Sequence, residues 1–187
     1  MNRAFLSVAS NIRPRENILT AIGRLTETSR VRTVSRCFVT AAIPAADRPP
    51  TNALPSFINC VVLVETAYGA SAFKDEILRP LEQALGRVRT DNRYAPRPID
   101  LDLLLFNDEQ HTEDGLTIPD PEIFARWFLA QGILDIDGDV MVPHATAPFR
   151  ALVAARRDLC CPAGAAVPED RPLRRDILAL IASGLAS

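Results

Sequence analysis

The chain has 187 residues, of which 48% are hydrophobic and 24% are charged, and its formal net charge is −2. This is the composition of an ordinary globular protein, and it excludes long-range disorder, a collagen-like repeat and a disulfide-rich scaffold. At ~150 residues per domain, we expect about one domain with a core of its own. The near balance of 21 basic and 23 acidic residues predicts no general attraction to nucleic acid or to an anionic membrane.

The N-terminal segment carries no pattern typical of an export signal. It reaches Arg13 and Arg15 before an apolar core develops, and no run of ~18 apolar residues occurs in the chain. We therefore expect a cytoplasmic protein without a membrane partner. The cysteines include one adjacent pair and no CxxC motif, so reduced structural thiols are expected rather than zinc ligands or disulfides. They are Cys37, Cys60, Cys160 and Cys161.

The first quarter of the chain predicts a strand, a helix and a second strand. Residues 4–8 form a short apolar run that ends near Ser10 and Asn11, both favourable residues at the start of a helix. Apolar residues recur at helical spacing over 17–25, and β-branched residues are frequent over 31–40. A β-α-β unit is therefore expected.

The middle of the chain predicts a loop, a strand and a helix. Residues 41–56 contain four prolines, too many for a helix or a central strand, and a loop of this length is a candidate lid. Residues 57–65 are typical of a strand. Residues 72–85 carry apolar side chains four apart and predict a helix, in which Pro80 should cause a kink.

A further strand is predicted at 99–106, and a helix that starts with proline and glutamate at 121–135. The imperfect alternation of strands and helices favours an α+β sheet covered by helices. From residue 147 onward the chain is rich in Ala, Arg and Pro. We therefore divide it into a main domain at 1–146 and a C-terminal helical appendage at 147–187, which we expect to be peripheral.

Charged residues are densest between Gly86 and Asp102, where four arginines come shortly before two aspartates. Asp100 and Asp102 are two apart in a predicted strand, so they project from the same face at a spacing of ~7 Å. Aspartate is depleted in strands, and Mg²⁺ commonly binds one or two carboxylates together with substrate phosphates. A solvated strand face, whose carboxylates pair with nearby arginines, explains this local pattern equally well.

The arginines favour a site for phosphate and metal. Guanidinium groups bind phosphate oxygens bidentately and stay charged throughout a reaction. The chain has no GxxxxGK[ST] motif and a single lysine, Lys74, which excludes a P-loop and the apparatus of a protein kinase. It also lacks GxGxxG, which removes the simplest dinucleotide-binding fold. Because it has no GxSxG and only two histidines, His111 and His144, a hydrolase triad has little support.

The segment RYAPRPIDLDLLLF, residues 93–106, resembles the signature of the 6-hydroxymethyl-7,8-dihydropterin pyrophosphokinase family. Four further segments match this family in order and at its spacing, and together the matches cover roughly residues 4–145. They are SNIRPRENI (10–18), FINCVVLVET (57–66), LEQALGRVR (81–89) and LTIPDPEIFARWF (116–128).

This resemblance implies a ferredoxin-like α-β-α sandwich, with a mostly antiparallel sheet covered by helices. It also implies an enzyme of folate biosynthesis that transfers pyrophosphate from ATP, the co-substrate, to the hydroxymethyl group of the dihydropterin and releases AMP. Two Mg²⁺ ions would be held by Asp100 and Asp102 and would neutralise the charge of the triphosphate.

The resemblance further implies a role for individual residues. The catalytic groups would be Arg87, Arg97, Asp100 and Asp102. The ATP contacts would be Glu82, Arg89, Arg93, Leu103, Thr117, Asp120 and Arg126. The pterin would lie against Thr40, Ile43, Phe57, Asn59 and Phe128. Without the resemblance, core packing would explain both phenylalanines and helix-surface charge would explain Glu82, whereas Asn59 in an apolar strand needs hydrogen-bond partners.

The departures from the family pattern gather on the nucleotide side. Asp120 replaces a histidine, Pro121 replaces an aromatic or polar residue, and Gly115 often corresponds to a basic residue. Thr90 corresponds to a lysine in many relatives, and Tyr94 stands where the family usually has a tryptophan. We therefore expect nucleotide binding to differ more from the family than pterin and metal binding.

Three functions remain open from the sequence. The first is a Mg²⁺-dependent pterin pyrophosphokinase that is a monomer or weak homodimer. The second is a protein that binds a pterin but has lost or altered the nucleotide-dependent transfer. The third, a nucleic-acid-binding domain that uses the arginines, is disfavoured by the near-neutral charge and by the interleaved aspartates.

Overall fold

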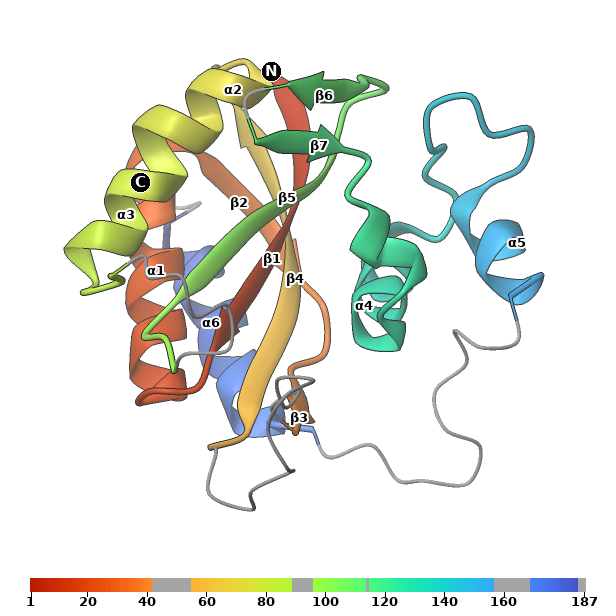
Figure 1. The fold of residues 1–187 in the computed structure, drawn as a ribbon. Helices are drawn as coiled ribbons and strands as arrows, with labels where there is room; N and C mark the ends of the chain where they lie inside the picture. Colours follow the sequence, from red (N-terminus) through yellow and green to blue (C-terminus); the bar gives the residue numbers. More distant parts are fainter. Residues whose placement is uncertain (42–54, 89–95, 114, 157–168, 185–187) are drawn as a thin grey trace, which may run out of the picture.

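A computed structural model describes residues 1–41, 55–88, 96–113, 115–156 and 169–184 of the chain (Figure 1). The strands are β1 (Asn2–Ser10), β2 (Arg30–Val34), β3 (Phe38–Thr40), β4 (Phe57–Thr66), β5 (Asp100–Phe106), β6 (His111–Glu113) and β7 (Leu116–Ile118). The helical segments are α1 (Pro14–Thr28), α2 (Ala70–Ala72), η1 (Phe73–Leu78), α3 (Arg79–Ala84), η2 (Pro121–Phe124), α4 (Trp127–Asp137), α5 (Phe149–Ala154) and α6 (Arg171–Gly184).

The main sheet has the strand order β2-β4-β1-β5, and β3 also pairs with β4. All of these pairings are antiparallel. The strands β6 and β7 form a separate antiparallel hairpin. The prediction of an α+β fold with a mostly antiparallel sheet is therefore confirmed.

Helices cover both faces of this sheet, as the α-β-α prediction requires (Figure 1). On one face, apolar residues of α1, α3 and α6 join the alternate strand residues Leu6 and Val8 in the larger core cluster. On the other face, η2, α4 and α5 pack with Phe5 and Val61 in a second cluster. The period-2 alternation of a strand sends its side chains to both clusters.

The helix predicted at 72–85 consists of three consecutive pieces, α2, η1 and α3. Its middle piece is a π-helix, in which the backbone N–H of Arg79 bonds to the carbonyl of Lys74. Pro80, at the start of α3, has no N–H, and its ring would clash with a carbonyl four residues earlier in an ideal α-helix. The wider turn directly before Pro80 accommodates this ring, so the expected irregularity is present as a π-turn.

Three predicted boundaries differ from the structure. The strand predicted at 31–40 is divided into β2 and β3, because the connection carries one residue more than β4 opposite it. The helix predicted at 121–135 is divided into the 3₁₀-helix η2 and the α-helix α4. The N-cap of α1 is Arg13 rather than Ser10 or Asn11, and Pro14 lies in the first turn, a position that suits proline.

The C-terminal helix α6 is not peripheral, which corrects the expectation for residues 147–187. Its residues Leu173, Ile177 and Ile181 are at most 4% exposed and belong to the larger core cluster. They recur every four residues, so one face of α6 is apolar and covers α1 and β2. The division of the chain at residue 146 stays a prediction.

Two of the four cysteines, Cys37 and Cys60, are free and buried. Cys160 and Cys161 lie outside the described residues, as do residues 42–54 of the candidate lid. Among the described helices, none is both long enough and apolar enough to cross a membrane.

Helix α4 lies unusually close to the sheet at Gly132. A Cβ atom added there would lie 2.4 Å from Cγ2 of Val61 on β4, which is closer than atoms can pack. We therefore predict that Gly132→Ala lowers the free energy of unfolding by about 1–3 kcal/mol through overpacking. Urea denaturation measures this change.

Gly23→Ala in α1 is the matched control. The added Cβ would lie 3.8 Å from Leu180, an ordinary contact. Alanine favours a helix over glycine by about 0.5–1 kcal/mol, so this variant should be as stable as the wild type or more stable. A Gly132→Ala protein that gained stability to the same extent would contradict the close packing of α4 on β4.

Candidate active site

Glu82 is the buried centre of a polar cluster beside the edge strand β5. It is 2% exposed, and its Oε1 accepts hydrogen bonds from the backbone N–H of Leu101, at 2.8 Å, and from Nη1 of Arg87. Leu101 lies on β5, which ends the strand order of the main sheet. Glu82 therefore satisfies a backbone donor at the sheet edge, and it is not an ordinary helix-surface charge.

Asp100 is held between two guanidinium groups. Its Oδ1 accepts a hydrogen bond from Nη1 of Arg87, and its Oδ2 accepts one from Nη1 of Arg97 at 2.5 Å. All three side chains are mostly buried, and charge-assisted bonds of this kind are stronger than exposed ion pairs. The structure thus brings the four predicted catalytic groups and one predicted ATP contact into a charged cluster. Its members are Glu82, Arg87, Arg97, Asp100 and Asp102.

Asn11 fixes the segment that carries Arg97. Its Oδ1 accepts a hydrogen bond from the backbone N–H of Arg97 at 2.8 Å, and its own N–H donates to the Arg97 carbonyl at 3.3 Å. Its Nδ2 donates to the carbonyl of Pro55 at 3.5 Å. The sequence assigned Asn11 only to the start of a helix. Asn11 lies inside the segment SNIRPRENI, which matches the family, and this was the sequence signal for a role beyond the start of a helix.

Asp102 carries an unfavourable negative charge in the free protein. Desolvation by the surrounding protein raises the pKa of Asp102 to about 7, and the charges of Asp100 and Glu82 add to this rise. The positive charge of Arg87 acts in the opposite direction. Solvent screens part of the effect, because the side chain of Asp102 is still exposed. A cation at this position would relieve the repulsion between the carboxylates.

The donor set of the charged cluster fits Mg²⁺ only in part. Asp100 and Asp102 lie on one face of β5 and offer oxygen ligands, which Mg²⁺ prefers. Among the described residues, no group of three or more His, Cys, Asp or Glu side chains is arranged to hold a metal ion. The two aspartates therefore suit a Mg²⁺ ion that completes its shell with water and substrate phosphates.

Asp120 lies directly before η2 and caps that helix. Its Oδ1 accepts a hydrogen bond from the backbone N–H of Glu122 at 2.8 Å, and its own N–H donates to the carbonyl of Leu104 at 2.9 Å. Burial raises the pKa of Asp120, and the capping bond opposes this rise. Arg126 forms its described ion pair with Glu122. The negative charge of Asp120 also contributes to the raised pKa of Asp102, so it acts on the charged cluster.

The predicted pterin residues of β3 and β4 lie next to one another. Nδ2 of Asn59 donates a hydrogen bond to Oγ1 of Thr40 at 2.9 Å, and Phe57 is the cross-strand partner of Thr40. Asn59 is 5% exposed, whereas Phe57 is half-buried. Phe128 belongs to α4 and is also half-buried. The buried amide and the partly accessible ring are the groups that bind a flat polar heterocycle.

The strand register places both groups of residues on one face of the sheet. Asn59 pairs with Ala9, and Ala9 pairs with Asp100. In the next row, Val61 pairs with Ser7 and Ser7 with Asp102. Paired residues point to the same side, and Asp100 and Asn59 are two strands apart, or ~10 Å between their backbones. The small side chains of Ala9 and Ser7 form the floor between them.

The other predicted contacts are only partly placed. Ile43, Arg89, Arg93, Thr90 and Tyr94 lie outside the described residues. The side chain of Leu103 is 2% exposed and belongs to the larger core cluster, on the face of β5 opposite to Asp102. Its side chain is therefore not in the charged cluster. Thr117 is exposed on β7.

Gly115, one of the departures from the family pattern, has a structural explanation. Its φ of 70° is in the left-handed region, which glycine adopts without strain. Its carbonyl accepts a hydrogen bond from Nζ of Lys74 at 3.0 Å. A basic side chain is thus directed to this turn from η1, although the turn residue itself is glycine.

Comparison with protein families gives a match over most of the chain. The model for 7,8-dihydro-6-hydroxymethylpterin-pyrophosphokinase (HPPK) matches residues 5–138. The 2-amino-4-hydroxy-6-hydroxymethyldihydropteridine pyrophosphokinase of Pseudomonas aeruginosa is 33% identical over 147 residues, which are 76% of this chain and 85% of the relative. The enzyme of the same name from Haemophilus influenzae is 30% identical over 148 residues, 77% of this chain and 87% of the relative.

Solved structures support the same fold. The wild-type HPPK-DHPS of Plasmodium falciparum with pterin and p-hydroxybenzoate superimposes with a TM-score of 0.61, at 14% identity, over 82% of this chain. The match covers 41% of that solved chain, so this protein spans less than half of its length. At this identity the likeness shows the fold alone.

The raised pKa of Asp102 predicts a stability that depends on pH. The folded protein binds this proton more tightly than the unfolded chain, in which the pKa is 3.8, so stability falls as the pH rises from 3.8 through about 7. Asp102→Asn removes the charge and should stabilise the protein at pH 8 but not at pH 4. Because solvent screens the exposed side chain, the gain should not exceed about 1 kcal/mol.

Urea denaturation at both pH values, without divalent cations, measures this difference. The control is Asp108→Asn, which replaces an exposed aspartate outside the charged cluster and should give no such gain. An Asp102→Asn protein that is less stable than the wild type at pH 8 would contradict the unfavourable charge.

Proposed function

Since the chain belongs to the 7,8-dihydro-6-hydroxymethylpterin-pyrophosphokinase family, we propose that residues on the sheet face of Asp100 and Asn59 transfer pyrophosphate from ATP to 6-hydroxymethyl-7,8-dihydropterin. The products are the pyrophosphorylated pterin and AMP, in a step of folate biosynthesis. The observation that carries the proposal is the row Asp100, Ala9 and Asn59, which joins the charged cluster to the pterin residues.

The pterin lies, in this proposal, over the end of β4. Asn59 and Thr40 offer directed hydrogen bonds to its edge, and their mutual bond of 2.9 Å orients the Asn59 amide in the free protein. Phe57 and Phe128 offer aromatic faces to the ring. Ile43 stays a proposed contact from the sequence. The hydroxymethyl group would then point along the row towards Asp100.

The triphosphate lies over the charged cluster. Arg87 and Arg97 are proposed to bind its oxygens, exchanging the carboxylates of Glu82 and Asp100 for phosphate. Asp100 and Asp102 are proposed to hold two Mg²⁺ ions, which would supply charge neutralisation for the phosphoryl groups. The further ATP contacts proposed from the sequence are Arg89, Arg93, Leu103, Thr117, Asp120 and Arg126, with Leu103 acting through its backbone.

We further propose a monomer or weak homodimer in a reducing compartment such as the cytoplasm. Cys37 and Cys60 are free thiols, which agrees with a reducing environment.

The reaction is tested by the nucleotide product. Incubation with ATP, Mg²⁺ and the hydroxymethyl dihydropterin should release AMP and not ADP. Asp100→Asn and Asp102→Asn should each lower the rate of AMP release by at least ~100-fold, because each removes a proposed metal ligand. Glu65→Gln, on β4 and outside the charged cluster, is the control and should keep the wild-type rate.

The outcomes separate the pyrophosphokinase from the alternative of a pterin-binding protein. Pterin binding without AMP release would support the alternative of a pterin-binding protein without transfer, which the names of the relatives do not favour. Wild-type rates in both aspartate variants would show that these carboxylates are only a solvated strand face.

Asp120 should weaken nucleotide binding, because its charge lies near the proposed triphosphate site. Asp120→Asn removes the charge and keeps an effective helix cap, since Asn and Asp cap equally well. We predict that this variant binds ATP with Mg²⁺ about three- to tenfold more tightly, or ~1 kcal/mol, as measured by calorimetry. Asp120→His should act in the same direction but lose the cap.

Pterin affinity is the internal control for this variant and should stay constant, because the pterin residues lie on β3, β4 and α4 and asparagine keeps the cap of η2 before α4. A loss of ATP affinity in Asp120→Asn would show instead that Asp120 is required as a ligand. Unchanged affinity would show that its charge does not reach the nucleotide.

A further inference from the structure

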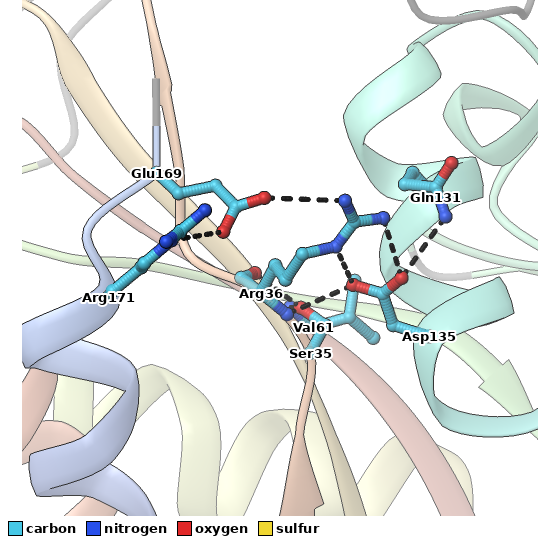
Figure 2. A network of polar contacts seen from close by, with 7 residues as sticks. All are labelled: Ser35, Arg36, Val61, Gln131, Asp135, Glu169 and Arg171. Atoms are coloured by element: carbon cyan, nitrogen blue, oxygen red, sulfur yellow. Dashed lines mark hydrogen bonds and ion pairs between the residues drawn. The ribbon is translucent and has the colours of Figure 1, made fainter. Parts of the chain in front are cut away.

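Arg36 connects three parts of the fold that are distant in sequence (Figure 2). It lies in the irregular connection between β2 and β3, which carries one residue more than the part of β4 opposite it. Its Nε and Nη2 donate to the two carboxylate oxygens of Asp135 on α4, at 2.9 and 2.8 Å. Its Nη1 donates to Oε1 of Glu169, directly before α6, at 3.3 Å.

The contact with Asp135 is built more firmly than a surface ion pair. The backbone N–H of Arg36 donates to the same carboxylate at 3.0 Å, and Nε2 of Gln131 donates to it at 3.1 Å. The side chain of Asp135 is 12% exposed. Burial acts to raise the pKa of Asp135, but the bonds from Arg36 outweigh it and hold the pKa below its usual value. A two-pronged contact of this kind, in which the carboxylate is mostly buried, restricts the rotation of α4.

The contact with Glu169 belongs to a second attachment. Glu169 forms a β-bridge with Phe38, and the N–H of Asp170 donates to the carbonyl of Cys37 at 2.8 Å. The strand β3 is therefore held by β4 on one side and by this C-terminal segment on the other. The segment is anchored in turn by α6, whose apolar face is in the core.

Two of the three parts that Arg36 connects, β3 and α4, carry proposed pterin residues. On the strand side, Phe38 pairs with Asn59, and Thr40 follows two residues later. On the helix side, Phe128 is preceded by Trp127, whose ring meets that of Phe38 edge to face at 5.3 Å. The Arg36 guanidinium itself lies 5.3 Å from the Phe38 ring. The position of α4 relative to β3 thus decides how far Phe128 lies from Asn59.

We infer that Arg36, held by Asp135 and Glu169, is a positioning residue for pterin binding that fixes the Phe128 wall of the pocket relative to the Asn59 wall. This inference rests on the proposed function. None of the three residues touches the charged cluster in the described contacts, so the effect should fall on the pterin and not on the nucleotide. The segment at 169–170, which lies beyond the residues matched by the family model, contributes to this positioning of Arg36 and β3.

Asp135→Asn and Arg36→Lys test the inference by calorimetric titration. Both lose the forked contact, and we expect the Kd for 6-hydroxymethyl-7,8-dihydropterin to rise about 5- to 30-fold, while the Kd for ATP with Mg²⁺ changes less than twofold. Asp135→Glu keeps a carboxylate that Arg36 can bind, so it should recover most of the pterin affinity. Asp137→Asn is the matched control, because Asp137 lies on the same helix but pairs with Arg3 instead.

A readout that needs no substrate follows from Trp127, the one tryptophan of the chain. Its fluorescence in the free protein reports on the packing against Phe38 and Phe128. The emission should shift to longer wavelength in Asp135→Asn and Arg36→Lys and stay unchanged in Asp137→Asn. If Asp135→Asn fails to fold, Glu169→Gln provides the milder variant, with a smaller loss of pterin affinity in the same direction.

Each result decides between the alternatives. Pterin and ATP affinities that fall together, or no rescue by Asp135→Glu, would show a general structural role and overturn the inference. Wild-type pterin affinity in Asp135→Asn and Glu169→Gln would overturn the inference and leave the proposed function intact. A wild-type protein that binds no pterin would overturn the proposed function, and this inference with it.

Discussion

Negative charge concentrated at the free edge of β5 is the constraint on which the rest of the site depends. The charges of Glu82, Asp100 and Asp120 act on Asp102 there, and the charge of Arg87 offsets only part of this effect. Desolvation by the surrounding protein, together with these like charges, makes the ionised form of Asp102 unfavourable in the free protein and raises its pKa. Such a cost is typical of a site that a bound cation completes.

The fold makes this concentration possible in two ways. The edge strand leaves the N–H of Leu101 without a strand partner, so Glu82 can be buried with a donor of its own. The pleat then places Asp100 and Asp102 on the face opposite to Leu101, where Ala9 and Ser7 leave room above the sheet. The same register brings Asn59 to that face. The pterin end and the phosphate end are therefore fixed by one set of backbone hydrogen bonds.

Local features of this arrangement could be predicted from the sequence. The alternation of apolar residues with Asp100 and Asp102 predicts a strand with both carboxylates on one face, and Asn59 within an apolar strand predicts a partnered amide. These predictions depend on neighbours two residues apart, where strand geometry alone decides. The irregularity at Pro80 was predictable for the same reason, because the missing N–H is a local property.

Contacts between distant segments were not predictable in this way. Arg36 and Asp135 are 99 residues apart, and nothing in either local pattern indicates their pairing. The same holds for the burial of Glu82, for the bonds between Asn11 and Arg97, and for the packing of α6 into the core. In each of these cases tertiary packing overrides a local pattern that is typical of a surface or a linker.

In this account, the carboxylates at β5 bind a cation that enters the site together with the nucleotide. This coupled binding is tested most directly by the protons released when ATP with Mg²⁺ binds, measured by calorimetry at pH 6.5 in buffers of different ionisation enthalpy. The pKa of Asp102 is raised in the free protein and a bound cation lowers it, so a fraction of a proton should be released per nucleotide at pH 6.5. At pH 8.5 the release should fall below ~0.1. Binding at pH 6.5 without proton release, or with proton uptake, would contradict the account.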